Sequence, residues 1–535
     1  MTSWIAIAPV LVAIVTGTVA LLVRNWPRLQ RAIAVSGTVV YAAVVGYLSW
    51  RVVFAADAGG ILYQLGGLEA PFGIVLVADE LSAFMLAITA IVAVYAVVFS
   101  VQFIDEQNQR VYYYPLFQFL LLGATGAILT GDLFNLFVWF EVMLMASYVF
   151  VAFYGNAQHT AAAVRYVVLN IVGSALMLLG VGGLYAATGT LNMADMAVQL
   201  SAPGAVTEPV VGLSALIFVT FSLKAGLAPF QFWVPSAYRA TPLPVVAVFA
   251  GATKKVGIYA IIRLYFTIFG NADVSATVPA VAGDTALAFL APVLLVMGLA
   301  SVLVGGFGAV SRDSLEELLA YSSIGQIGFI AVAVAVAAAT TAAELRHLGI
   351  FAGLVFALHH AVSKGLLFLS TAVIRDMAGT TKLSELGGLG DRSPLFASVF
   401  LVGGLSLVGI PPLAGFFGKL FVFDAATRQF AAATGDSTAT AVAVLTLGIL
   451  FVGAVLTILY ATRAWIGTFW GSQTERIQTG VIHDGQVAVL ATLAIVVLAI
   501  GVGFEPVYQF ADAASEAALD TDGYIEIVGP GGESR

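Results

Sequence analysis

The sequence contains no cysteine. The chain therefore forms no disulfide and supplies no thiolate ligand to a zinc ion or an iron–sulfur cluster. It also lacks the GxxxxGK[ST] pattern of a nucleotide-binding P-loop, so no motif indicates nucleotide hydrolysis. We expect no cofactor, and any energetic work must draw on an ion gradient or on partner subunits.

Charged residues are scarce as well. They form 10% of the 535 residues, whereas hydrophobic residues form 60%. Because soluble domains carry about a quarter charged residues, this composition predicts a polytopic protein embedded in the lipid bilayer. The net charge of −8 argues against nucleic acid as a partner.

Apolar runs of membrane length recur from one end of the chain to the other. The first run lacks the basic residues that precede a signal-peptide core, so we expect it to remain as an uncleaved span. The acidic tail after Phe504 is expected to be external and poorly ordered. We predict an all-α fold with fourteen transmembrane helices at 3–23, 31–52, 78–104, 112–130, 133–154, 162–187, 208–239, 243–268, 284–309, 318–340, 346–374, 396–427, 439–470 and 485–505.

Basic residues between these spans are unevenly distributed, and cytoplasmic loops attract positive charge. The uneven distribution predicts a multi-pass protein of the cell membrane with an even number of spans and both termini outside. The cytoplasmic set is Arg24, Arg28, Arg31, Arg110, Arg165, Arg239, Arg312, Arg375, Lys382, Arg392, Arg463 and Arg476. The external set is Arg51, Arg346, Arg428 and Arg535.

Two predicted spans contain proline close to a lysine. Pro229 follows Lys224 by five residues, and Lys419 follows the Pro411-Pro412 pair by seven. Proline removes a backbone donor and clashes with the preceding turn, so each helix should break there. A membrane helix tolerates a break only where protein or water satisfies the freed backbone groups.

Interrupted helices in matching places of two halves point to a transporter built from internal repeats. We therefore expect two inverted five-helix repeats, formed by helices 4–8 and 9–13. The predicted divisions are 1–110 for helices 1–3, 111–268 for the first repeat, 284–470 for the second repeat, and 471–535 for helix 14 with the acidic tail.

Ionisable residues inside the spans are the candidate functional groups. Each basic side chain at mid-bilayer costs about 2.5–3.5 kcal/mol, so retaining several indicates a function. Glu141 is the one firmly mid-span carboxylate, whereas N-capping explains Asp132. The basic residues are Lys224, Lys254, Lys255, Arg263, Lys364 and Lys419.

Each candidate has a structural alternative. Glu141 and Lys224 could form a static buried ion pair, but such pairs stabilise weakly, so we favour function. Lys254 and Lys255 point about 100° apart, so we expect one of them to face the interior, and Lys254 could snorkel or pair locally. Arg263 lies near a helix end, where an anchoring role is expected.

A histidine pair precedes another lysine in FALHHAVSKGLLFLS. His360 and Lys364 are four residues apart and share a helix face. Histidine titrates near neutrality, so a proton relay is favoured over packing. Metal binding by His359 and His360 is disfavoured because no carboxylate lies nearby in the sequence.

These groups permit an electrostatic proton-transfer mechanism. A change in the distance between Glu141 and Lys224 would alter where a proton prefers to reside. Moving one charge through 100 mV involves about 2.3 kcal/mol, which a swing of about two pKa units matches. The expected order of transfer is Lys224, Lys255, His360, Lys364 and Lys419.

Three stretches carry a family resemblance: TGDLFNLFVWFEVMLMASYV, RYVVLNIVGSALMLLGVGGLYAATGTLNMADM and GLSLVGIPPLAGFFGKL. They resemble the antiporter-like subunits shared by respiratory complex I and the multisubunit Mrp-type cation/proton antiporters, most of all the D subunits of the latter. The resemblance covers helices 3–13. It implies broken helices 7 and 12, and it implies transfer roles for Glu141, Lys224, Lys255, His360, Lys364 and Lys419. His359 has no clear counterpart in it.

The resemblance implies a proton-translocating subunit that exchanges Na⁺ for protons together with other membrane subunits, and not an enzyme. The first alternative is a membrane-arm subunit of complex I or of a membrane-bound hydrogenase, because a fold does not settle a function. A non-conducting scaffold is the second alternative, but a scaffold should have lost the charged residues.

Overall fold

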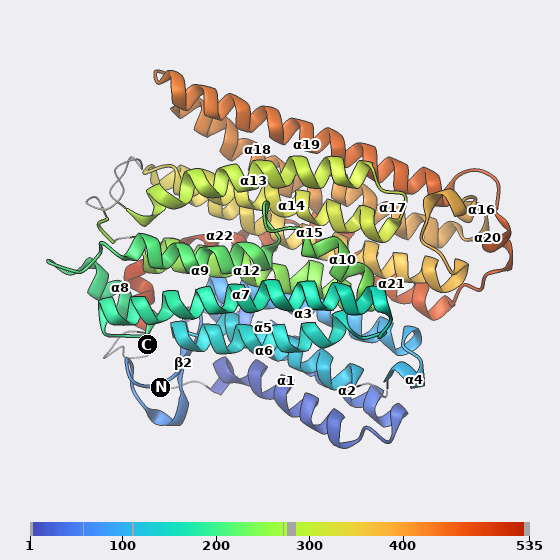
Figure 1. Cartoon of the computed structure of the whole chain (residues 1–535), viewed down its shortest axis with the longest axis horizontal. Helices are drawn as coiled ribbons and strands as arrows, with labels where there is room; N and C mark the ends of the chain where they lie inside the picture. The colour runs from blue at the N-terminus through green and yellow to red at the C-terminus, as the bar shows by residue number, and fades with distance from the viewer. Residues whose placement is uncertain (1–3, 57, 110–111, 271, 275–284, 529–535) are drawn as a thin grey trace.

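The computed structural model describes residues 4–56, 58–109, 112–270, 272–274 and 285–528. Within these ranges, eleven helices are long and apolar enough to cross a membrane, and three shorter apolar helices lie among them. Most of the helices run along the long axis of the molecule (Figure 1). This arrangement confirms the predicted all-α polytopic fold.

The helices follow the predicted spans closely. The N-terminal group is α1 (Trp4–Leu22), α2 (Pro27–Ser49), η1 (Trp50–Phe54), α3 (Glu80–Phe103) and α4 (Glu106–Gln109). The next group is α5 (Tyr113–Leu129), α6 (Leu133–Val151), α7 (Ala157–Thr188), α8 (Met193–Ser201), α9 (Val210–Ala225), α10 (Trp233–Ala240), α11 (Leu243–Val248), η3 (Phe249–Thr253), α12 (Lys254–Ile262) and η4 (Arg263–Ile268).

The second half begins with α13 (Ala286–Val310), α14 (Leu315–Ala338), α15 (Ala343–Ala378), η5 (Leu383–Glu385), α16 (Leu389–Arg392), α17 (Pro394–Val408), α18 (Ala414–Ala432) and α19 (Ser437–Phe469). It ends with α20 (Glu475–Thr479), α21 (Asp484–Val502), α22 (Glu505–Leu519) and α23 (Thr521–Val528). Helix pairs occupy the two spans predicted to break, α9–α10 and α17–α18. The count of fourteen crossings, the inverted repeats and the four divisions remain predictions; Arg110 and Arg535 lie outside the described residues.

The structure contains a short β-hairpin that the sequence did not predict. Strands β1 (Ile61–Gln64) and β2 (Val75–Ala78) pair antiparallel, joined through the turn η2 (Leu65–Gly67), and β2 is fully buried. The hairpin lies at the end of the molecule where both termini lie, whereas α4, α16 and α20 lie at the opposite end (Figure 1). Termini at one end are what an even number of crossings requires.

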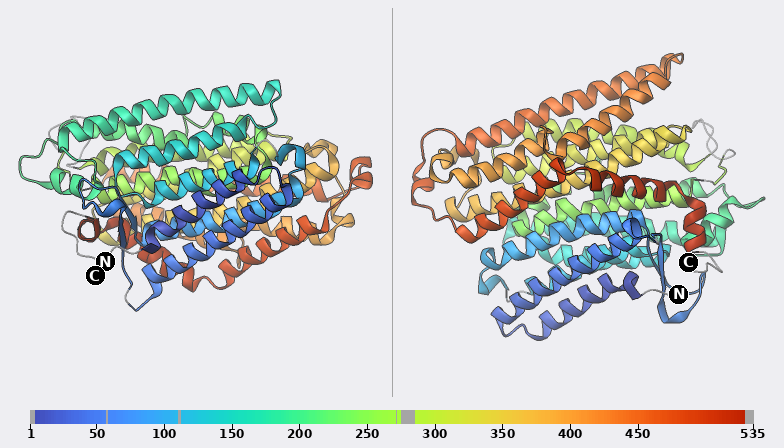
Figure 2. Two further views of the ribbon diagram at one scale, coloured as in Figure 1. Left: turned by 90° about the horizontal axis from the view of Figure 1, so that it is seen from below. Right: turned by 180° about the vertical axis from the view of Figure 1, so that it is seen from behind.

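The expectation of a poorly ordered tail was wrong over the described residues, which end at Val528. Helices α22 and α23 pack against the bundle near the hairpin (Figure 2). In α22, Ala511, Ala514 and Ala518 are buried against neighbouring helices. Their spacing of three and four residues forms one apolar helix face, and the acidic residues that suggested disorder lie off this face.

Helix α15 lies between the two halves of the structure and packs against both. Its residues are buried from Gly349 to Ile374. It packs against α14, α17 and α18 of the second half and against α3, α11 and η3 of the first half, with α22 along its side. A side chain on α15 can therefore face either half of the protein.

Close approach of α13 and α14 gives a stability prediction. A Cβ atom at Gly305 would overlap the backbone of Gly325, whereas a Cβ at Gly448 on α19 meets open space. We expect Gly305→Val to cost about 1–3 kcal/mol through overpacking, measured as a lower melting temperature of the purified protein. The control Gly448→Val has the same change in helix propensity, and equal losses in both variants would contradict the packing model.

Candidate functional site

Lys224 lies in the last turn of α9 and is fully buried. Its Nζ donates to the hydroxyl of Tyr166 at 2.9 Å, and that hydroxyl also contacts Ser147 Oγ at 3.1 Å. Glu141 accepts a hydrogen bond from Ser174 instead. No ion pair joins Glu141 to Lys224 within the described part of the chain, so the static-pair alternative does not describe this structure.

At the helix break beyond Lys224, other protein groups form hydrogen bonds with the backbone groups that the break frees, as is required inside a membrane. The indole Nε1 of Trp233 donates to the carbonyl of Leu223 at 2.8 Å. The backbone nitrogen of Ala228, next to Pro229, donates to Ser301 Oγ at 2.8 Å. Because Ser301 belongs to α13, this contact ties the broken helix of the first half to the second half.

Both Lys254 and Lys255 are buried, so the expectation that only one faces the interior was wrong, as was snorkelling of Lys254. All of α11, η3, α12 and η4 is enclosed by other helices, so every face of this segment is interior. Lys254 Nζ has no hydrogen-bond partner among the described residues, and a Cβ on Gly226 would lie 2.9 Å from it. Lys255 Nζ donates to the carbonyl of Ala250 within the π-helical turn η3 and lies 2.9 Å from His360 Nδ1.

Helix α15 directs its ionisable residues to different neighbours. His360 faces Lys255 of the first half, and Lys364 Nζ donates to the carbonyl of Leu319 in α14 at 2.9 Å. His359 points toward α18, where a Cβ on Gly418 would lie 3.0 Å from its Nε2. Both ring nitrogens of His359 are buried without a hydrogen-bond partner in the described structure.

The second broken helix places Lys419 on the far side of its break. Gly409 follows α17 in the left-handed conformation with φ 92°, and Pro411 and Pro412 lie between α17 and α18. Lys419 Nζ reaches back across the break and donates to the carbonyl of Val408, the last residue of α17, at 2.7 Å. The break thus frees the Val408 carbonyl to accept a hydrogen bond from Lys419.

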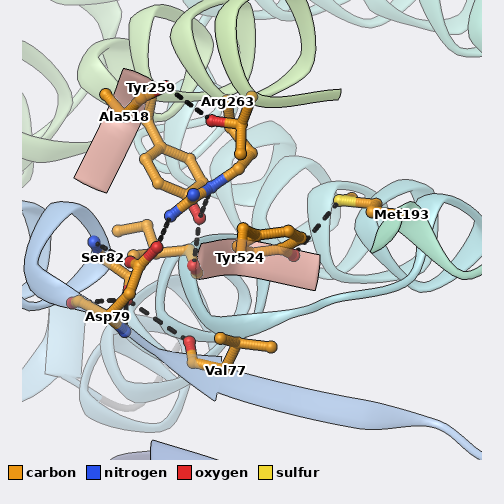
Figure 3. Close-up of polar contacts among 10 residues, drawn as sticks. Val77, Asp79, Ser82, Met193, Tyr259, Arg263, Ala518 and Tyr524 are labelled. Atoms are coloured by element: carbon orange, nitrogen blue, oxygen red, sulfur yellow. Dashed lines mark hydrogen bonds and ion pairs between the residues drawn. The ribbon is translucent and has the colours of Figure 1, made fainter. Parts of the chain in front are cut away.

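Two further charged residues are placed clearly by the structure. Asp132 caps α6 by accepting from the backbone and side-chain nitrogens of Asn135, as predicted, and burial raises the pKa of its carboxyl. Arg263 is buried and forms an ion pair with Asp79, a partner that the sequence did not indicate; its anchoring role remains a prediction (Figure 3).

Sequence reasoning missed Asp79, Tyr166 and Ser174. Asp79 carries a usable signal, because the ADELS stretch is a capping pattern in front of an apolar run, and Asp79 with Ser82 forms that capping box. Tyr166 and Ser174 carry none, since a hydroxyl in an apolar helix does not reveal its partner on another helix.

One group of side chains has the spacing of metal ligands. His347 on α15 and Asp512 and Glu516 on α22 place ligand atoms within 4.8 Å of one another. His347 Nε2 lies 3.3 Å from Asp512 Oδ1, and this contact accounts for the geometry without a metal ion. His347 lies near the start of α15, before the histidine pair of that helix, and Asp512 and Glu516 lie on α22.

The arrangement is a polytopic helical subunit with two broken helices and a buried series of lysines and histidines. The family described as NADH:quinone oxidoreductase/Mrp antiporter membrane subunits matches residues 130–446. The D subunit of the Na(+)/H(+) antiporter of Alkalihalophilus pseudofirmus is 34% identical, with 98% of this chain and 99% of the relative covered.

Two solved structures show the same fold over 98% of this chain and all of theirs. One is the Mrp complex of Dietzia sp. DQ12-45-1b, with TM-score 0.83 and 28% identity. The other is an archaeal membrane-bound sulfane sulfur reductase, with TM-score 0.83 and 26% identity. The fold and its buried charges define an antiporter-like membrane subunit. The chain belongs to the family of Mrp antiporter D subunits and is a transporter subunit, not an enzyme.

The buried amine of Lys254 gives a second stability prediction. Burying a polar group without a hydrogen bond costs about 1–3 kcal/mol, so Lys254→Met should raise the melting temperature of the purified protein. Lys364→Met, which removes an amine that does donate, should bring a smaller gain. A lower melting temperature for Lys254→Met would show that this amine has a partner in the folded protein.

Proposed function

We propose that this chain is the proton-translocating subunit of a multisubunit Na⁺/H⁺ antiporter of the cell membrane. Protons move between the two halves along a mid-membrane series. We call this series the lysine axis: Glu141, Lys224, Lys255, His360, Lys364 and Lys419. Lys254, His359 and Asp132 are secondary candidates.

The 2.9 Å contact between Lys255 and His360 is the observation that carries this proposal. It joins a helix of the first half to α15, and both side chains are buried. An ionisable group inside the membrane costs free energy and generally marks an ion or proton pathway. Two such groups in direct contact across the two halves therefore support proton transfer between them.

Movement of Glu141 relative to Lys224 would drive the transfer. Their hydroxyl partners Ser174 and Tyr166 hold them separately in this structure. When the carboxylate approaches, it favours the charged ammonium, and when it retreats, Lys224 releases its proton inward. Tyr166 and Ser147 would then act as positioning groups.

The surroundings of Glu141 support partner subunits. Glu141 is half-buried and lines an apolar surface groove of about 490 Å³ with Phe119, Phe137 and Met145. A carboxylate at the edge of lipid-facing apolar surface is costly, and a neighbouring membrane subunit would cover it.

The orientation with both termini outside is part of the proposal. At the end of the molecule with α4, α16 and α20, Arg392 belongs to α16 and Arg476 to α20, which supports assigning this end to the cytoplasm. The hairpin and α23 then face outward.

A redox-driven complex is the second candidate, supported by the match to the archaeal sulfane sulfur reductase. Small membrane subunits purified with this chain would support the antiporter. Iron–sulfur or flavin subunits would support the redox complex.

The central test removes the charges that start the series. Glu141→Ala and Lys224→Ala should each lower Na⁺-dependent proton movement by about a hundredfold or more, the scale that a positioned proton carrier contributes. Transport is measured in everted vesicles with Na⁺ and K⁺ separately, alongside the amount of protein in the membrane. Arg428→Ala, which removes an exposed charge, is the control and should transport normally. Normal transport in either axis variant at normal abundance would refute the proposal.

A further inference from the structure

The end of the molecule with both termini contains a cavity of about 470 Å³ that we call the terminal cavity. Its walls come from the β1 strand, the start of α3, and α22 with α23. Four carboxylates line it, from Asp79, Glu80, Asp520 and Glu526, with one basic residue, Arg51. This excess of negative charge favours cations over anions inside the cavity.

Asp79, which lines the terminal cavity, forms a buried ion pair with Arg263 behind the cavity wall. The side chains of Asp79 and Arg263 are 4% and 3% exposed. The ring of Tyr524 on α23 covers the Arg263 guanidinium at 4.7 Å, so the C-terminal helix closes over the pair (Figure 3). Arg263 Nη1 is buried and makes no hydrogen bond within the described residues.

The same helix segment leads from this pair to the lysine axis. Lys255, Tyr259 and Arg263 are spaced by four residues, so they share one helix face over about 12 Å. Arg263 Nε contacts the Tyr259 hydroxyl at 3.5 Å, and that hydroxyl donates to the carbonyl of Ile128 at 2.6 Å. Lys255, at the inner end of this face, contacts His360.

We propose that the terminal cavity is the external access of the lysine axis for protons, with the Asp79–Arg263 pair as its inner gate. This inference rests on the proposed function and extends it. A proton from external water binds the Asp79 carboxylate and neutralises it, so the attraction to Arg263 is lost and the pair can separate. The Asp79 carboxyl then releases the same proton to water that enters between the separated side chains. This water carries the proton past Tyr259 to the neutral amine of Lys255, and the Asp79 carboxylate pairs with Arg263 again. Arg263 stays charged throughout because a guanidinium is not deprotonated in proteins.

The absence of cysteine makes the access test direct, because a single introduced thiol is unique in this chain. Ala517 on α22 lines the terminal cavity and accepts a cysteine with little change in size. Ala517→Cys is placed in the complete native assembly in sealed right-side-out vesicles, and antiport is measured before and after external labelling. The reagents are a cationic and an anionic methanethiosulfonate of similar size.

The cationic label should lower antiport by about tenfold, the lower end of what focused charge contributes to cation capture. The anionic label should inhibit less. Phe72→Cys, on the exposed segment between β1 and β2, is the matched control and should be labelled without effect. Unchanged antiport after full labelling of Ala517→Cys would overturn the access role, while the Glu141→Ala result would still decide the proposed function separately.

A charge exchange distinguishes a gate from a structural clamp. Asp79→Arg combined with Arg263→Asp keeps an ion pair but moves the carboxylate away from the cavity wall. We expect the melting temperature of this double variant to recover relative to Asp79→Arg alone, without recovery of antiport. Recovery of both would show a clamp. If the exchanged protein does not fold, the labelling result stands alone as the test.

Discussion

The burial of basic side chains with few carboxylate partners is the constraint on which the rest of the structure depends. Lys224, Lys254, Lys255, Lys364 and Lys419 are all buried, yet no ion pair with a carboxylate serves any of them within the described residues. Each amine needs another acceptor, because an unsatisfied buried polar group is costly.

Irregular helices supply some of these acceptors. A regular helix uses its carbonyls internally, but a break or a π-helical turn frees one for a side chain. Lys255 donates to Ala250 inside η3, and Lys419 donates to Val408 where α17 ends. The prolines and the π-helical turn therefore interrupt the helices and also free carbonyl acceptors for buried amines at membrane depth.

The sequence predicted the helical fold, the broken helices and the identity of the buried lysines, because hydropathy and proline act locally. It could not predict what those lysines contact. Tyr166 binds Lys224 from a helix 58 residues away, and Asp79 binds Arg263 from 184 residues away. The burial of Lys254 and the packing of α22 also depend on neighbouring helices, which the local pattern does not contain.

The contact between Lys255 and His360 limits how charge can be arranged along the axis. Nζ and Nδ1 are 2.9 Å apart, a distance that accommodates one hydrogen atom between the two nitrogens. A doubly protonated imidazole facing an ammonium would place two donors against each other. At this separation the two side chains accommodate at most one positive charge between them, because two charged groups would set donor against donor. Under the proposed function, repulsion between neighbouring basic groups of the lysine axis would favour the transfer of protons one after another.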